Sequence, residues 1–250
     1  MDEPLLQTQE LTRRFGALAA VHRVSLAFEA RRVHAVIGPN GAGKSTFLNL
    51  LSGELRATGG QIRFRGEDVT RATPDRLSRM GIGRSYQTAN LFAALSCSDC
   101  VWLAAQSRLR SSMLFFRPAE RHAEVGDRAA RALEACGLSD RRSAVAGQLS
   151  YGEQRQLELA MMLATDPTLL LLDEPLAGLG HDEALRVVEL LRKVARGRTV
   201  ILVEHDMDAV FSVSDAVTVL VDGRVLLTGS PAEIRASAAV REAYLGEELA

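Results

Sequence analysis

A glycine-rich segment near the amino end constrains this 250-residue chain more than any other feature. The segment from Gly38 to Ser45 fits the pattern G-x-x-x-x-G-K-[ST] without a mismatch. An apolar, β-branched run from Val33 to Ile37 precedes it, and a helix that should stop at Gly53 follows it. One face of that helix is apolar: Phe47, Leu48, Leu50 and Leu51. A strand, a glycine-rich loop and a helix in this order are typical of a nucleoside triphosphate site, so we expect an α/β fold with a P-loop NTPase core.

The residue types of this loop suit the binding of an anion. Gly38, Gly41 and Gly43 permit backbone conformations in which successive N–H groups point at a phosphate, and the following helix adds its positive end. Lys44 should reach the outer phosphates, and the Ser45 hydroxyl should bind the Mg²⁺ ion that bridges them. The expected nucleotide contacts are Asn40, Gly41, Ala42, Gly43, Lys44, Ser45 and Thr46. The alternative is a glycine-rich turn with a solvated lysine.

A second apolar run, Leu169 to Leu172, ends in two carboxylates, Asp173 and Glu174. In a doubly wound sheet, ligands gather outside the carboxyl ends of the strands, and the glycine-rich loop lies at the same edge. We therefore expect Asp173 to assist the Mg²⁺ ion through water, and Glu174 to accept a proton from the water that attacks the γ-phosphate. The alternative is that Asp173 caps a turn and Glu174 is merely solvated.

A third apolar run, Thr199 to Val203, ends in Glu204, His205 and Asp206 at the same predicted edge. His205 can donate a hydrogen bond to the γ-phosphate and orient the attacking water, because imidazole can both donate and accept near neutral pH. We assign no such role to the other four histidines.

Ser150 and Glu153 form a capping-box pattern ahead of the helical stretch Gln156 to Ala164. Such a pattern is common and can be no more than a well-capped helix. It can also be a second anion site, in which the Ser150 hydroxyl, the Gly152 backbone and the helix dipole are directed at a phosphate. The residues alone leave both interpretations open.

Composition argues against several other classes of protein. The net charge of −1 implies no basic surface, so nucleic acid is not an expected partner. No apolar stretch approaches the ~20 residues of a membrane span, and the amino end lacks a secretory pattern, so we expect the chain to stay in the cytosol. Cys97, Cys100 and Cys136 are too few for a disulfide framework and lack the companions of a zinc site, and we expect them in the core.

The order of these motifs resembles that of the ATP-binding subunits of ABC transporters, over essentially the whole chain. The resemblance implies ATP and Mg²⁺ as ligands. It also implies a dimer, in which Ser150, Gly152 and Glu153 contact ATP held by the glycine-rich loop of a second ATPase subunit, identical or paralogous. Each pair of chains would then hold two composite sites.

Further site residues follow from the same resemblance. Gln87 matches the glutamine that links Mg²⁺ and the attacking water to the membrane partner. Phe15 matches the aromatic residue that stacks on adenine, although it could equally be a core residue. The resemblance therefore gives Lys44, Gln87, Glu174 and His205 as catalytic residues, and Ser45, Gln87 and Asp173 as the residues around the metal ion.

Shorter motifs are similar to those of the branched-chain amino acid uptake group, which includes importers of urea and other small polar solutes. These motifs are Phe15 to Leu18, Ile82 to Gln87, Leu91-Phe92, Ala104 to Gln106 and Ala243 to Gly246. Three pairs of residues depart from the pattern, and none of these departures removes a catalytic group. They are Arg31-Arg32 in place of Gly-Glu, Asp99-Cys100 in place of Glu-Asn, and Gly180-His181 in place of Asn-Pro.

The resemblance implies a single ABC ATPase domain over residues 1–250, with a small antiparallel β subdomain and a helical subdomain inserted at about residues 93–149. Asp222-Gly223 between two apolar runs predicts a β-hairpin. Within the insert, Met113 to Phe116 is an apolar cluster that either lines a groove for a membrane subunit or belongs to the subdomain core.

We therefore expect the ATP-hydrolysing subunit of an importer, bound peripherally at the cytoplasmic face of the inner membrane to two permease subunits and served indirectly by a solute-binding protein. An exporter ATPase of the lipopolysaccharide type has similar size and motifs and is one alternative. A DNA-repair or translation ATPase is another, although the coiled coils and basic arms usual in those proteins are not evident. The transported solute is selected by other subunits and is not encoded here.

Overall fold

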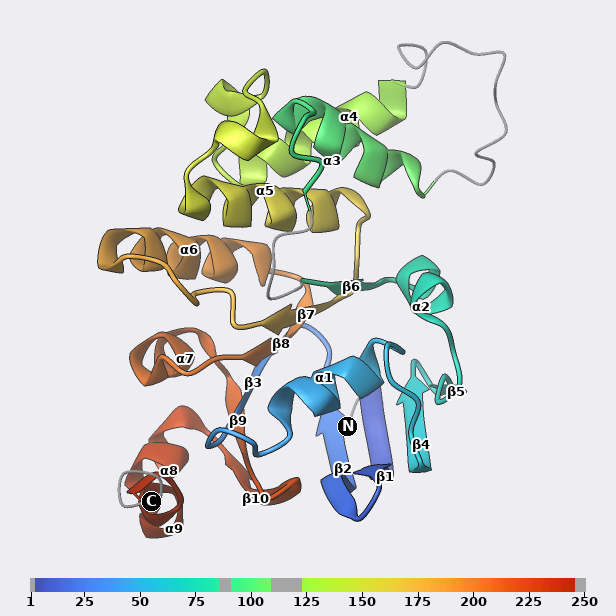
Figure 1. Ribbon diagram of the computed structural model, residues 1–250, viewed down its shortest axis with the longest axis vertical. Helices are drawn as coiled ribbons and strands as arrows, with labels where there is room; N and C mark the ends of the chain where they lie inside the picture. The colour runs from blue at the N-terminus through green and yellow to red at the C-terminus, as the bar shows by residue number, and fades with distance from the viewer. Residues whose placement is uncertain (1–2, 86–90, 109–122, 246–250) are drawn as a thin grey trace.

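The computed structural model describes residues 3–85, 91–108 and 123–245 (Figure 1). Its centre is a six-stranded sheet. The strands are β3 (Val33–Ile37), β6 (Ile82–Arg84), β7 (Leu169–Asp173), β8 (Thr199–Val203), β9 (Ala216–Val221) and β10 (Arg224–Gly229). They lie in the order β10-β9-β3-β8-β7-β6, and every pair is parallel except the hairpin of β9 and β10.

The three central strands β3, β8 and β7 are buried along their whole length. Leu170 and Leu172 face one layer of the core, and Leu169 and Leu171 face the other. Both faces are covered, which explains why these segments are continuously apolar. The register pairs Val203 of β8 with Asp173 on one side and with Val36 on the other. The carboxyl ends of the three strands therefore meet at one edge, as the sequence predicts.

A second, antiparallel sheet covers one face. Its strands are β1 (Leu6–Phe15), β2 (Leu18–Phe28), β4 (Gly59–Phe64) and β5 (Glu67–Asp68), in the order β2-β1-β4-β5. Helix α1 (Lys44–Leu51) lies between the two sheets (Figure 1). Its buried face contains the four apolar residues that the sequence predicts. It ends at Leu51, and its C-cap Ser52 directly precedes Gly53.

Helices cover the other face. α6 (His181–Val194) lies on the sheet, α5 (Tyr151–Ala164) lies on α6, and α3 (Cys97–Gln106) and α4 (Ala123–Ala135) lie beyond α5 (Figure 1). α3 and α4 fall within the predicted insert, and α5 packs against both. The remaining helices are α2 (Pro74–Met80), α7 (Met207–Val213), α8 (Pro231–Ala236) and α9 (Ala238–Leu245). None of the helices in the described ranges is both long and apolar enough to cross a membrane.

Two local predictions are confirmed. Asp222 and Gly223 join β9 to β10 with φ values of 48° and 72°, the backbone that a two-residue hairpin turn requires. Cys97, Cys100 and Cys136 are free and buried, and burial raises the pKa of Cys136 to about 12. These thiols therefore behave as core groups.

Candidate nucleotide-binding and active site

The glycine-rich loop joins β3 to α1, and close contacts require two of its glycines. A Cβ on Gly38 would lie 2.0 Å from the carbonyl oxygen of Leu220 in β9. A Cβ on Gly43, which has φ 94°, would lie 2.1 Å from the carbonyl oxygen of Ala20 in β2. The loop backbone is thus packed against two strands, and a larger residue at either glycine would displace it.

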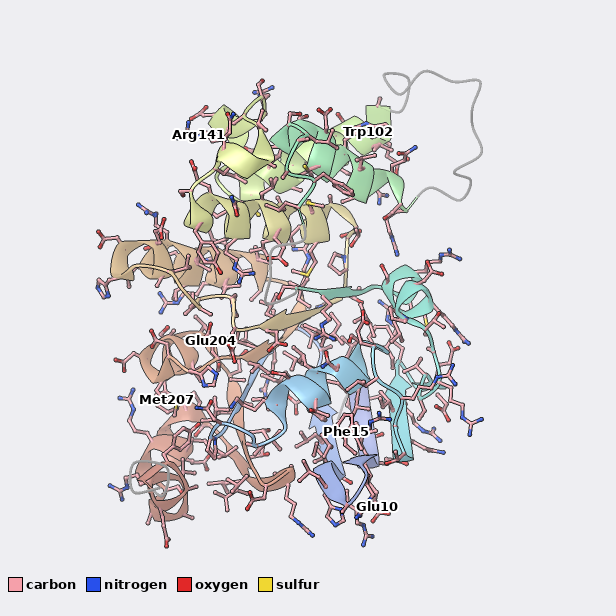
Figure 2. The ribbon with its side chains drawn as sticks, viewed as in Figure 1. Glu10, Phe15, Trp102, Arg141, Glu204 and Met207 are labelled. Atoms are coloured by element: carbon pink, nitrogen blue, oxygen red, sulfur yellow. The ribbon has the colours of Figure 1, made fainter. Side chains whose placement is uncertain are left out.

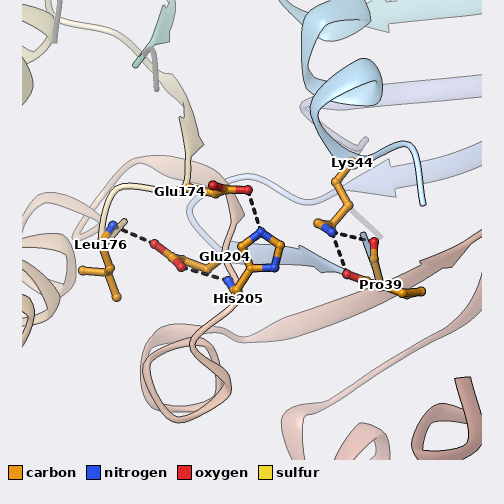
Figure 3. A network of polar contacts seen from close by, with 7 residues as sticks. Pro39, Lys44, Glu174, Leu176, Glu204 and His205 are labelled. Carbon is orange, nitrogen blue, oxygen red and sulfur yellow. Dashed lines mark hydrogen bonds and ion pairs between the residues drawn. The ribbon is translucent and has the colours of Figure 1, made fainter. Parts of the chain in front are cut away.

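Lys44 is the first residue of α1, and it is only 6% exposed. Its Nζ atom donates hydrogen bonds to the carbonyl oxygens of Gly38 at 2.6 Å and Pro39 at 2.8 Å (Figure 3). A buried ammonium group needs acceptors of this kind, and phosphate oxygens are stronger acceptors than carbonyls. The other expected contacts adjoin it, in the loop and the first turn of α1: Asn40, Gly41, Ala42, Gly43, Ser45 and Thr46.

Asp173 at the end of β7 is buried and lies beside a cation and a hydroxyl. Nη2 of Arg84 lies 3.6 Å from its Oδ2 atom, and the Ser45 side chain hydrogen-bonds to its carboxylate. Burial raises the pKa of Asp173, and the Arg84 guanidinium acts against that rise. The Oδ1 atom of Asp173 is buried and has no hydrogen-bond partner among the described residues. An unpartnered carboxylate oxygen next to a serine hydroxyl fits Mg²⁺, which takes oxygen ligands.

Glu174 and His205 come together from the ends of β7 and β8. Nε2 of His205 lies 2.6 Å from Oε1 of Glu174, and Figure 3 shows the pair at the sheet edge that also carries Lys44. Glu174 has φ 48°, in the left-handed region that costs a non-glycine residue about 1 kcal/mol or more. A carboxylate and an imidazole in contact beside a phosphate loop can accept a proton from water and donate a hydrogen bond to a phosphate oxygen.

Two polar residues of this region were not assigned a role from the sequence. Arg84 contacts Asp173 and also donates hydrogen bonds to Asn49 and Ser52 near the end of α1. Glu204, next to His205, is buried and accepts backbone hydrogen bonds. Burial raises the pKa of Glu204, and the N–H groups of Leu176, His205 and Asp206 act against that rise. The sequence contains a signal for Glu204, because a carboxylate at the end of a buried strand is costly unless its burial is compensated.

Ser150, Gly152 and Glu153 lie at the start of α5, and the predicted capping box is confirmed. Oγ of Ser150 accepts the Glu153 N–H at 3.2 Å, and Oε2 of Glu153 accepts the Ser150 N–H at 3.0 Å. Oε1 of Glu153 accepts a hydrogen bond from Nε of Arg141 at 2.9 Å. The backbone hydrogen bond from Ser150 lowers the pKa of Glu153. Both carboxylate oxygens of Glu153 therefore have partners within the chain.

One chain does not bring these three residues to its own phosphate loop. α5 lies on the side of the six-stranded sheet that α6 covers, and α1 lies on the other side (Figure 1). Figure 2 shows Arg141, the partner of Glu153, at the helical end of the molecule and Phe15 beyond the sheet. A single chain therefore carries the two expected halves of a site in separate places.

Phe15 ends β1 and is 45% exposed, so its ring is available for stacking. The Arg13 guanidinium lies over the ring, with Cζ 4.5 Å from the centroid. Gln87 and the cluster Met113 to Phe116 lie outside the described residues.

Known families and proteins match this chain over most of its length. The family model described as "ABC transporter" matches residues 21–177, and the model described as "Branched-chain amino acid ATP-binding cassette transporter" matches residues 224–250. The high-affinity branched-chain amino acid transport ATP-binding protein LivG of Salmonella typhimurium is 39% identical over 254 residues, covering 99% of this chain and all of LivG.

Solved structures have the same fold. The crystal structure of the ADP conformation of MJ1267, an ATP-binding cassette of an ABC transporter, has a TM-score of 0.87 and 28% identity, covering 98% of this chain and 100% of that one. The dimeric post-hydrolysis structure of the cassette MJ0796 bound to ADP and Pi has a TM-score of 0.76 and 25% identity, covering 90% and 98%. The chain therefore belongs to the ABC transporter family and is one of its ATPase subunits.

Proposed function

We propose that this chain hydrolyses ATP to drive the import of branched-chain amino acids, or of a related small polar solute, through two membrane permease subunits. The observation that best supports the hydrolytic part is the contact between His205 and Glu174 at the sheet edge that carries Lys44. A base, an imidazole and a cation then surround the place of the terminal phosphoryl group. The names of the relatives support the class of solute.

Each residue of the site has a proposed task. Lys44 exchanges its two carbonyl acceptors for phosphate oxygens, and the loop N–H groups hold the remaining charge. Glu174 takes the proton of the attacking water, while His205 donates a hydrogen bond to the γ-phosphate. Ser45 and Asp173, with Gln87, would hold Mg²⁺, which supplies positive charge to the phosphate oxygens when bound. Phe15 stacks on the adenine.

The site is complete only when two chains meet. Ser150 and Gly152 of one chain would close over the nucleotide of the other, with the N-terminus of α5 directed at its phosphates. The dimeric MJ0796 structure bound to ADP and Pi supports this arrangement. The partner is a second copy or a paralogue.

A groove next to the site suits a permease subunit. An open groove of about 520 Å³ lies between α5 and β6, and Arg84, Phe92 and Met161 are among its lining residues. Phe92 is 52% exposed. Both apolar and polar residues line this groove, and such a groove can take an amphipathic helix of a partner protein. Gln87 precedes Leu91 and Phe92 by a few residues in the sequence, so we propose that it connects this groove to the nucleotide and that the groove holds the chain at the membrane.

Reconstituted transport tests this function. The full chain is purified with its native membrane subunits, inserted into vesicles and supplied with a solute-binding protein, MgATP and labelled leucine. We expect ATP-dependent accumulation of leucine that is absent from a complex carrying Lys44→Ala. A complex that hydrolyses ATP but accumulates neither leucine nor urea would contradict the import function, and lipid release by that complex would favour the exporter alternative.

A further inference from the structure

A buried carboxylate that takes no part in the proposed reaction holds the two loops that carry Glu174 and His205. Glu204 directly follows β8 and is 4% exposed. Its Oε1 atom accepts the Leu176 N–H at 2.7 Å, and its Oε2 atom accepts the His205 N–H at 2.9 Å (Figure 3). A buried carboxylate is costly unless its oxygens are hydrogen-bonded, and both oxygens of Glu204 are.

The turn that leads to Leu176 is strained. Glu174 has φ 48° although Pro175 follows it, and both conditions are unfavourable for a non-glycine residue. A conformation of this kind persists only where the surroundings hold it. On the amino-terminal side of this turn, the Glu174 N–H donates to the carbonyl oxygen of Val203 at 2.8 Å. On its carboxyl-terminal side, Glu204 accepts the Leu176 N–H.

The same carboxylate holds the loop of the imidazole. The His205 N–H that it accepts belongs to the residue whose ring lies 2.6 Å from Glu174. One side chain thus joins the backbones of both loops whose side chains meet. Figure 3 shows Glu204 on the side of His205 away from Lys44, so Glu204 is placed to act through these backbones and not on phosphates beside Lys44.

We propose that Glu204 is a positioning residue for hydrolysis, which fixes Glu174 and His205 relative to each other without touching the nucleotide. The inference rests on the proposed roles of those two residues. A variant with weaker hydrogen bonds to residue 204 should have a lower kcat and unchanged MgATP binding, because Glu204 holds neither the phosphate loop nor Phe15 in place.

Glu204→Gln is the most conservative variant. It keeps the volume but replaces one acceptor oxygen with an NH₂ group that faces a backbone N–H. We expect kcat to fall at least about tenfold, and the KM for MgATP to change by less than about twofold. Unchanged kcat, or equal losses of kcat and MgATP affinity, would overturn the proposal.

Glu233→Gln is the matched control. Glu233 is also a carboxylate that caps a backbone, since its Oε2 atom accepts the Ser230 N–H at 2.7 Å, but it belongs to α8. We expect its kcat to stay within about twofold of the wild type. A loss of kcat equal to that of Glu204→Gln would show a general effect of lost caps and would also overturn the proposal.

A mutant cycle separates positioning from a structural role. In a chain that already carries Glu174→Gln and His205→Ala, adding Glu204→Gln should change single-turnover hydrolysis by less than about twofold, because nothing remains to be positioned. An undiminished tenfold loss in that background would show that Glu204 acts elsewhere and contradict the proposal.

If Glu204→Gln fails to fold, a change in the backbone still tests the proposal. Replacing the Leu176 amide with an ester removes one donor and leaves every side chain in place. We expect lower kcat at unchanged MgATP affinity; unchanged kcat would overturn the proposal. ATP hydrolysis and leucine uptake by the wild type test the proposed function itself. The positioning role of Glu204 is tested only by the ratios of hydrolysis rates between variants.

Discussion

His205 Nε2 lies 2.6 Å from Glu174 Oε1, although the two residues are 31 positions apart in the chain. Parallel strands β7 and β8 end side by side, and each residue directly follows or nearly follows its strand. An ionised Glu174 can accept a hydrogen bond from this ring only if Nε2 carries the proton. A ring in that tautomer can donate toward the carboxylate or toward a phosphate oxygen.

Lys44→Ala should strongly weaken nucleotide binding. Lys44 is one of only two lysines in the chain, and the other, Lys193, lies near the end of α6. Removing the buried cation beside the loop should weaken MgATP binding at least about a hundredfold. Titration calorimetry checks this, with Lys193→Ala as the control that binds as the wild type does. Equal affinity of the two variants would contradict the role of Lys44.

Two inactive variants should complement each other if the site is shared between chains. Glu174→Gln removes the proposed base, and Gly152→Asp adds a carboxylate where a Cβ would lie 2.8 Å from Oε1 of Glu183. In an equimolar mixture, half of the dimers are mixed and each has one intact site, so about a quarter of wild-type ATPase activity should return. A mixture as inactive as its components would argue against composite sites.

Short-range signals made much of this site predictable. The strand, loop and helix around Lys44, the capping box of Ser150 and the hairpin at Asp222 each depend on neighbours in sequence, and each is confirmed. The meeting of Glu174 with His205 was also predictable, because the carboxyl ends of parallel strands share an edge. Gln87 lies outside the described residues, and its role stays a prediction.

Long-range polar contacts could not be predicted. Glu204 receives the Leu176 N–H across 28 positions, and no pattern in sequence specifies which backbone group faces a buried carboxylate. Arg84 likewise meets Asp173 only because β6 lies next to β7 at the edge of the sheet. Such partners depend on strand order and register, which the apolar runs do not encode.

Arg31→Gly should stabilise the fold. Arg31 has φ 59° in the turn between β2 and β3, where the related pattern has glycine. Relief of that strain, less the cost of the greater freedom of glycine in the unfolded chain, should raise the free energy of unfolding by about 0.5 kcal/mol and Tm by roughly 1–2 °C. Thermal unfolding checks this. Arg32→Gly removes the same charge from a residue outside the positive-φ set and breaks an ion pair with Glu29, so it should give no gain. Equal changes in Tm for Arg31→Gly and Arg32→Gly would contradict the backbone strain at Arg31.

His34→Gln should flatten the acid dependence of stability. Burial lowers the pKa of His34 from its usual 6.5, while Glu29 and Asp215 act against that shift. A group with a lowered pKa in the folded state, here a base, stabilises the fold above pH 6.5, and this stability is lost as the pH falls toward the folded value. Between about pH 7.5 and about pH 5, urea unfolding should show a smaller loss for the variant than for the wild type. Parallel losses would rule out His34 as the cause.

The most direct test of the hydrolytic site is single-turnover phosphate release from MgATP by Glu174→Gln and by the wild type, at matched nucleotide occupancy. We expect the variant to bind MgATP within about twofold of the wild type and to release phosphate about 10²–10⁴ times more slowly, because only the base is removed. Phosphate release at the wild-type rate would contradict the assignment of Glu174 as the base.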